Sequence, residues 1–241
     1  FKQKTAYESM PSLVGSEMYI RDRYRGYVLK KGRDPKKEQS YFLALIKREV
    51  LGNIILPLGN YTKNEVRKLA KKLGLITHDK KASEDLCFLV RTDYREFIKK
   101  EVNFEPGNII DKDGNVLGTH KGIAYFTIGQ RHGIGKPYKY PLYVIKIDAK
   151  TNTIVVGKEE DLYKKKLKAK EVNWLVDTPW HGKKVTVKIR YQHTGAQATL
   201  YLHNKNEVLV EFDEPQRAIT PGQLAVFFDG DVVLGGGFIE N

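Results

Sequence analysis

Cysteine is nearly absent from this chain: Cys87 is the single one in 241 residues. One cysteine excludes a disulfide within the chain and cannot supply a cysteine-based zinc cluster. The six histidines include no His-x-x-x-His pair, and no Gly-x-Ser-x-Gly sequence is present, so zinc-enzyme and serine-hydrolase chemistry have no support. Cys87 is therefore the one plausible side-chain nucleophile for covalent catalysis.

Long hydrophobic runs are also missing. No segment approaches the roughly 18 apolar residues that a membrane span needs, and the start at Phe1-Lys2-Gln3-Lys4 has no signal-peptide core. The content of 41% hydrophobic and 29% charged residues is that of an ordinary globular protein. We therefore expect a cytoplasmic protein with no membrane partner.

Acidic residues are outnumbered, with 29 Asp and Glu against 42 Lys and Arg, for a net charge of +13. The basic residues recur in runs beside aromatic residues, as in Tyr27 to Lys37 and Tyr163 to Lys170. Such runs suit a long polyanion better than a small acidic metabolite, so nucleic acid is the first partner to consider. The alternative is a lysine-rich composition whose charges only face solvent.

A helix is predicted from about residue 63 to 73. Thr62 and Glu65 have the spacing of a capping box, apolar residues follow at helical intervals, and Gly74 stands where a C-terminal cap would. Cys87 then lies in the connection that leaves this helix, where reactive residues are often found. A buried packing role for Cys87 remains the alternative.

The middle and the end of the chain carry different patterns. A short helix is predicted near 94–100, followed by a tight hairpin at Asp113-Gly114. The glycine-rich segment 127–135 lacks the ending of a P-loop and reads as an ordinary loop. The last third predicts a small antiparallel barrel, from strands at 185–191, 196–202, 207–212, 223–228 and 231–234. Small barrels often bind RNA, although a fold alone does not prove a function.

Read in order, the motifs resemble the tRNA-specific 2-thiouridylase family from about Tyr27 to Asn241. The blocks that carry the resemblance are Asp34 to Leu43, Pro57 to Gly59 with Thr62-Lys63 and Glu65 to Arg67, Lys81 to Phe88, Pro106-Gly107, Gly118 to Gly122, Tyr125 to Gly135, Lys188 to Tyr191, Pro215 to Ala218, Pro221 to Gln223 and Leu234 to Ile239.

The resemblance implies a fold of three parts. Residues 1–90 would be an α/β remnant of an ATP-pyrophosphatase domain, of the adenine nucleotide alpha hydrolase-like type. Residues 91–162 would be a small α+β or β central domain, and residues 163–241 an antiparallel β-barrel that binds RNA.

The resemblance also implies a reaction. In such enzymes ATP, with Mg²⁺, adenylates the C2 oxygen of the wobble uridine of a tRNA, and a cysteine persulfide then delivers sulfur to that carbon. Cys87 falls on the position of the persulfide cysteine, which accepts sulfur from a donor protein and needs an accessible thiolate.

Further positions match those that contact the tRNA anticodon stem-loop: Lys37, Glu38, Gln39, Arg190, Tyr191 and Gln223. Arg190 and the lysines would hold phosphates, while Gln39, Gln223 and Tyr191 would hydrogen-bond or stack on unpaired bases. Without the resemblance, the two glutamines could simply cap turns and Arg190 could be a surface charge on a strand.

The sequence departs from the family pattern in three places. It has no Ser-Gly-Gly-x-Asp-Ser nucleotide loop and no second cysteine to release the sulfur through a disulfide, and Arg21 to Tyr24 stands where the family usually has Thr-Gly-His-Tyr. We therefore expect either part of a thiouridylase whose nucleotide-binding part is absent, or a relative that binds RNA without adenylation. On either interpretation this chain alone does not complete the reaction.

Overall fold

The structure, a computed structural model, describes residues 16–21, 24–79, 105–134, 138–177, 179 and 181–240. Cys87 and the helix predicted near 94–100 lie outside these residues. The chain divides into two compact units. Unit 1 comprises Phe1–Lys80, Lys165–Glu214 and Pro221–Asn241, and unit 2 comprises Lys81–Lys164 and Pro215–Thr220. Residues from the two ends of the chain thus share unit 1.

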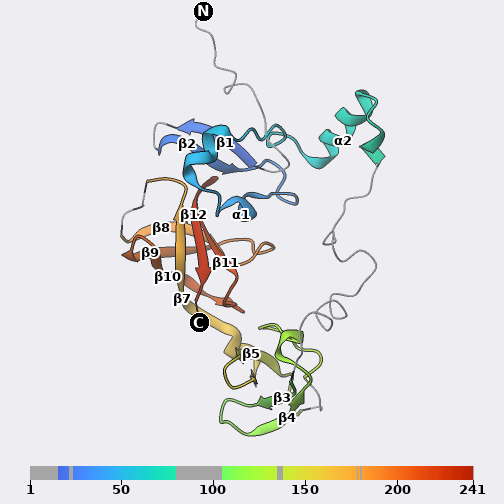
Figure 1. Cartoon of the computed structure of the whole chain (residues 1–241), viewed down its shortest axis with the longest axis vertical. Helices are drawn as coiled ribbons and strands as arrows, with labels where there is room; N and C mark the ends of the chain where they lie inside the picture. The colour runs from blue at the N-terminus through green and yellow to red at the C-terminus, as the bar shows by residue number, and fades with distance from the viewer. Residues whose placement is uncertain are drawn as a thin grey trace, which may run out of the picture. The chain divides into compact units, whose positions relative to one another are not determined.

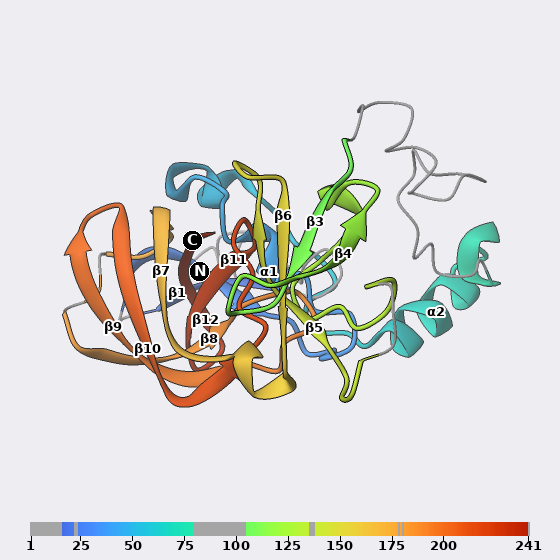
Figure 2. The ribbon, with the colours of Figure 1, turned by 90° about the horizontal axis from the view of Figure 1, so that it is seen from below.

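Six strands close into an antiparallel barrel (Figures 1 and 2). Around the barrel the order is β12, β11, β8, β9, β10 and β7, and β7 pairs with β12 to complete the ring. The strands are β7 (Tyr163–Trp174), β8 (Lys183–Lys188), β9 (Ala196–Asn204), β10 (Glu207–Arg217), β11 (Leu224–Asp229) and β12 (Val232–Ile239). The predicted antiparallel barrel is confirmed, and its closure leaves these strands without an open edge.

Most barrel strands bury alternate side chains, as their alternating polarity requires. In β8, Val185 and Val187 are buried while Lys184 is exposed. β11 differs, because all four residues 225–228 are buried. Val226 and Phe228 belong to a cluster that also contains residues from the first third of the chain. The outer face of β11 is therefore covered as well as its inner face.

The segment that covers β11 contains two strands and two short helices. β1 (Ser16–Arg21) and β2 (Tyr24–Lys31) form an antiparallel pair, and β2 joins β12 where Lys30 lies opposite Val232. The helix α1 (Ser40–Leu43) and the 3₁₀ helix η2 (Arg48–Asn53) follow.

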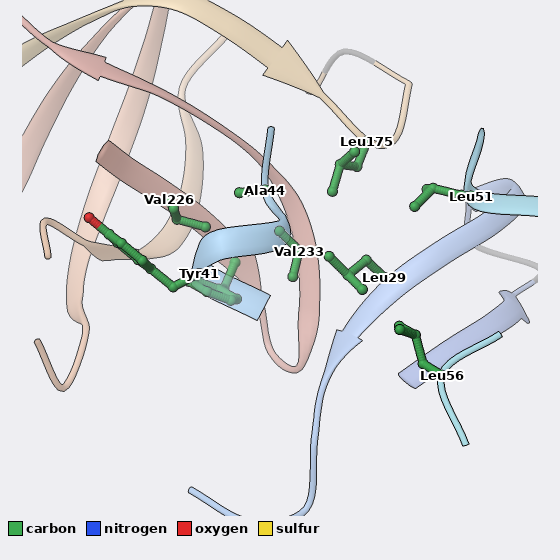
Figure 3. Close-up of a cluster of buried hydrophobic side chains, with 9 residues drawn as sticks. Leu29, Tyr41, Ala44, Leu51, Leu56, Leu175, Val226 and Val233 are labelled. Atoms are coloured by element: carbon green, nitrogen blue, oxygen red, sulfur yellow. The ribbon is translucent and has the colours of Figure 1, made fainter. Parts of the chain in front are cut away.

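One buried cluster joins this segment to the barrel (Figure 3). Its members are Leu29, Tyr41, Ala44, Leu51, Leu56, Leu175, Val226, Phe228 and Val233. A polar contact adds to the packing, because Asn173 of β7 donates its Nδ2 protons to the carbonyls of Ala44 (2.9 Å) and Ile46 (2.8 Å). These carbonyls lie just after α1 and would otherwise have no helical partner, so the barrel itself holds α1 in place.

The predicted helix is present as α2 (Lys63–Lys72) with its capping box complete. The Thr62 side chain accepts the backbone proton of Glu65, and the Glu65 carboxylate accepts that of Thr62. Gly74 has a φ of +69°, the left-handed conformation that commonly ends a helix. The short 3₁₀ helix η3 (Ile76–Asp79) follows.

Unit 2 contains a four-stranded sheet in the order β4, β3, β6, β5. Its elements are β3 (Gly107–Ile110), β4 (Val116–His120), η4 (Ile123–Tyr125), β5 (Tyr143–Asp148), β6 (Thr153–Gly157) and η5 (Glu159–Leu162). β3 and β6 are parallel, and the other neighbouring pairs are antiparallel. The core of the sheet is formed by Ile109, Val144, Ile154 and Val156.

The hairpin predicted around Asp113-Gly114 is present, but its turn is longer than expected. β3 and β4 pair up to Ile110 and Val116, which leaves a five-residue connection. The Asp111 carboxylate accepts the backbone protons of Asp113 and Asn115, each at 2.9 Å, and so stabilises the wider turn.

Among the described residues, no helix has both the length and the hydropathy that a membrane crossing requires.

Candidate functional site

Three distant segments of unit 1 meet around Tyr41 of α1. The Tyr41 hydroxyl donates to the carbonyl of Leu224 (3.1 Å) at the start of β11, and its ring lies 6.2 Å from that of Tyr191, which follows β8. Burial raises the pKa of the Tyr41 phenol above its ordinary value, and the nearby positive charge of Arg190 opposes that shift. The phenol therefore stays neutral and acts as a hydrogen-bond donor between the segments.

Gln39 and Tyr191 are in direct contact although 152 positions separate them. The Gln39 Nε2 atom donates to the Tyr191 hydroxyl at 3.3 Å. Beside them, the rings of Phe42 and Tyr191 have centroids 4.7 Å apart with an interplanar angle of 35°. Phe42 is 55% exposed, so this aromatic pair is accessible at the surface. We call Gln39, Phe42 and Tyr191 the aromatic surface.

The other predicted contact residues flank the aromatic surface. Arg190 precedes Tyr191 and lies close enough to Tyr41 to influence its phenol. Gln223 is exposed and precedes Leu224, and its backbone carbonyl accepts the Ile239 amide proton at 2.8 Å. Lys37 ends the turn that leads into α1, where its amide donates to the Asp34 carbonyl (3.2 Å).

Glu38 is placed differently from its neighbours, since only 6% of it is exposed. One carboxylate oxygen accepts the Ser40 backbone proton at 2.5 Å, and the other has no hydrogen-bond partner in the described part of the chain. Burial lowers the pKa of the neighbouring Lys31, and the negative charge of Glu38 opposes this shift. In this conformation the Glu38 carboxylate supports the start of α1 from inside.

Phe42 is the surface residue that the sequence analysis missed. It lies in the Asp34 to Leu43 block, three positions after Gln39. An aromatic residue within that block could have suggested a contact residue. The sequence does not show, however, which ring of this apolar run is exposed. Together the aromatic surface and Arg190 can stack on planar groups, hydrogen-bond to their edges and attract phosphate.

Several lysines of the barrel form ion pairs with nearby carboxylates. On the barrel, Lys166 lies 3.4 Å from Glu211, and Lys168 lies 3.2 Å from Glu207 and 3.0 Å from Glu240. Lys184 pairs likewise with Asp213 at 2.7 Å. In the run from Tyr163 to Lys170, Lys166 and Lys168 thus have carboxylate partners.

The glycine-rich segment of unit 2 forms a loop, as expected, over its described part. Gly129 donates to the Val144 carbonyl (2.8 Å), and Val144 donates to that of Gln130 (2.9 Å). The Gln130 side chain also accepts from Thr127 and donates to the His132 carbonyl. The two backbone bonds to Val144 attach the loop to β5, and the Gln130 side chain closes the loop on itself.

Three family models match consecutive parts of the chain. A tRNA methyl transferase HUP domain matches residues 3–91, a tRNA methyl transferase PRC-barrel domain matches 95–158, and an aminomethyltransferase beta-barrel domain matches 164–239. With the closed barrel, these matches confirm the predicted fold class, an α/β part followed by a small central domain and a C-terminal β-barrel.

The chain is also similar to curated proteins named tRNA-specific 2-thiouridylase MnmA. It is 45% identical to the MnmA of Halothermothrix orenii, over 89% of this chain and 61% of that protein. It is 45% identical to MnmA 1 of Caldanaerobacter subterraneus subsp. tengcongensis, over 98% of this chain and 67% of that protein, and 45% identical to the MnmA of Aquifex aeolicus, over 91% and 62%. The chain thus spans about three fifths to two thirds of the length of these relatives.

Proposed function

Because the chain belongs to the tRNA-specific 2-thiouridylase family, we propose that it is part of a tRNA-uridine 2-sulfurtransferase and provides the sulfur-carrying cysteine and an RNA-binding surface. Its substrate would be a tRNA, bound through the anticodon stem-loop. The observation that carries this proposal is the hydrogen bond between Gln39 and Tyr191, which joins two of the predicted contact residues beside an exposed aromatic ring.

The residues around the aromatic surface have complementary roles in this proposal. Tyr191 and Phe42 stack on unpaired bases, and the amides of Gln39 and Gln223 hydrogen-bond to base edges. Arg190 and Lys37 attract phosphates. Glu38 completes the predicted contact set, and its burial favours support of Gln39 over direct contact with RNA.

Cys87 is the proposed sulfur carrier. Its thiolate would take the terminal sulfur of a donor protein's persulfide, and the resulting Cys87 persulfide would pass that sulfur to C2 of the activated wobble uridine. Release through a disulfide needs a second cysteine, which this sequence does not contain. That cysteine would have to come from another part of the enzyme.

ATP with Mg²⁺ is the cofactor that the family suggests. The sequence contains no Ser-Gly-Gly-x-Asp-Ser loop, and among the described residues no group of three or more His, Cys, Asp and Glu could hold a metal ion. No described residue belongs to a sequence that matches the family's nucleotide loop, so we assign none of them a step that involves ATP or Mg²⁺.

The division into residues 1–90, 91–162 and 163–241 remains part of the proposal, supported by the limits of the three family models. A cytoplasmic location remains a prediction.

The experiment that tests this function follows the sulfur. The 241-residue chain is incubated with a persulfide-loaded cysteine desulfurase and analysed by intact mass. We expect the mass to rise by one sulfur atom, and Cys87→Ser to abolish the increase. In parallel, binding of unmodified tRNA is compared with that of a stem-loop of unrelated sequence. A chain that binds tRNA but never acquires sulfur would instead be a non-catalytic RNA-binding relative.

A further inference from the structure

The helix α2 has two opposite faces of different chemistry. With about 3.6 residues per turn, Val66, Leu69, Ala70 and Leu73 lie along one side. Along the other side run two pairs of basic residues spaced four apart, Arg67 with Lys71 and Lys68 with Lys72. We call these four residues the basic face of α2.

The basic face differs from the basic runs of the barrel. Within the part of the chain that the structure describes, Lys68, Lys71 and Lys72 have no ion pair with a carboxylate, whereas Lys166 and Lys184 each have one and Lys168 has two. The single acidic residue of α2 is Glu65, which is already bound to Thr62 and Arg33. All three unpaired lysines are exposed.

Helix stability alone does not explain this arrangement. Lys71 and Lys72 in the last turn do favour the helix dipole. However, like charges four residues apart repel each other and destabilise a helix, and Lys68 and Lys72 form such a pair. A bound polyanion would relieve this repulsion.

The segment that anchors the start of α2 also leads to the aromatic surface. The first backbone proton of the helix, on Lys63, is bound by the Asp34 carboxylate at 2.9 Å, and Arg33 pairs with Glu65. Asp34 also begins the turn that leads through Lys37 to Gln39. Beyond this anchor, α2 projects from the rest of unit 1 (Figures 1 and 2).

We propose that the basic face of α2 binds the phosphate backbone of an RNA duplex, next to the loop whose unpaired bases the aromatic surface would hold. This inference rests on the proposed function. The ten-residue helix is about 15 Å long, which is enough to contact several successive phosphates. The apolar face points the opposite way, so a partner that covers it would leave the basic face accessible.

The test compares two triple variants with equal loss of charge. One is Lys68→Gln, Lys71→Gln and Lys72→Gln on α2, and the matched control is Lys166→Gln, Lys168→Gln and Lys184→Gln on the barrel. For each, the affinity of the 241-residue chain for unmodified tRNA is measured by fluorescence anisotropy between about 50 and 200 mM salt. Each lost phosphate contact reduces the slope of log affinity against log salt by about 0.7 to 0.9.

We expect the α2 variant to reduce this slope by about 2 to 3 and the barrel variant to leave it nearly unchanged. Equal slopes for the two variants would overturn the proposal, since net charge alone would then explain the effect. An unchanged slope in the α2 variant would also overturn the proposal, even if the basic face were then found to bind an acidic protein instead of RNA. Circular dichroism checks that α2 stays folded in the variant.

A second RNA separates this inference from the proposed function. With a plain RNA duplex that lacks an anticodon loop, the α2 variant should still show the reduced slope, while Gln39→Ala should change nothing. If the wild-type chain prefers tRNA no more than this duplex, the proposed function fails while the phosphate site on α2 stands.

Discussion

Tyr191 allows the aromatic surface to be tested in two steps, because its hydroxyl and its ring make separate contacts. Tyr191→Phe removes only the hydrogen bond from Gln39. A neutral hydrogen bond contributes a net 0.5 to 1.5 kcal/mol, roughly, so the affinity for tRNA should fall by about 2- to 12-fold if that bond orients Gln39 toward a base. Tyr191→Ala also removes the ring that faces Phe42. Stacking of a base on an aromatic ring is worth about 1 to 3 kcal/mol, which corresponds to a loss of about 5- to 150-fold.

The assay is fluorescence anisotropy with unmodified tRNA at one fixed salt concentration, and urea unfolding confirms that each variant is folded. Tyr201→Ala is the matched control, because Tyr201 is a half-buried tyrosine of β9 whose ring packs on His181 at 5.3 Å. We expect this control to bind like the wild type. The reasoning is refuted if Tyr191→Ala binds as tightly as the wild type. It is also refuted if Tyr191→Phe loses as much affinity as Tyr191→Ala, since the ring would then contribute nothing.

Two further predictions concern the fold. Gly235→Ala should prevent the barrel from folding, since the added Cβ would lie 2.1 Å from the Asn173 carbonyl oxygen. Gly230 has a φ of +63° and open space around it, so Gly230→Ala should lower the free energy of unfolding in urea by only about 1 to 2 kcal/mol. Similar losses of stability in the two variants would contradict this prediction. The Thr62 amide and then Arg33 lower the pKa of the Glu65 carboxyl from its ordinary 4.5 to about 2. The stabilisation of α2 by the Glu65 carboxylate is therefore present above pH 4.5 and is lost as the pH falls toward 2. Far-UV circular dichroism should show that loss in the wild type and a flatter profile in Glu65→Gln, and identical profiles would count against the capping role.

The sequence predicted the helices and strands that are determined by interactions between residues close together in the chain. The capping box and Gly74 placed α2 correctly, and the strands predicted at 223–228 and 231–234 are present as β11 and β12. β7 was not predicted as a strand because its lysines were interpreted as a run of charge. Only a few apolar residues, among them Leu167 and Ala169, occupy its buried positions, so the alternation of a strand is weak there. The tight hairpin near Asp113 was misjudged because the Asp111 side chain favours a longer turn.

Contacts over long sequence distances could not be read in this way. A strand was predicted at 223–228, but the sequence did not indicate that Val226 and Phe228 pack in one cluster with Leu29 and Tyr41. The resemblance grouped Gln39 and Tyr191 as residues of one function, yet only the structure shows that they touch. The burial of Glu38 could not be read from the sequence either, because a charged residue is ordinarily expected at the surface, whereas only 6% of Glu38 is exposed.

The aromatic surface lies at the boundary between the barrel and the segment that covers it, so its geometry depends on how the two pack together. Gln39 and Phe42 come from the segment that covers the barrel, while Tyr191 comes from the barrel itself. Their distances are set by the buried cluster around Leu29 and Tyr41 and by the bonds of Asn173 to the end of α1. Loss of this packing should separate Gln39 from Tyr191, while the hydrogen-bonded ring of barrel strands can stay closed. Under the proposed function we therefore predict that RNA affinity falls when the covering segment detaches from the barrel, and that it responds more to substitutions at this boundary than to substitutions in the barrel core.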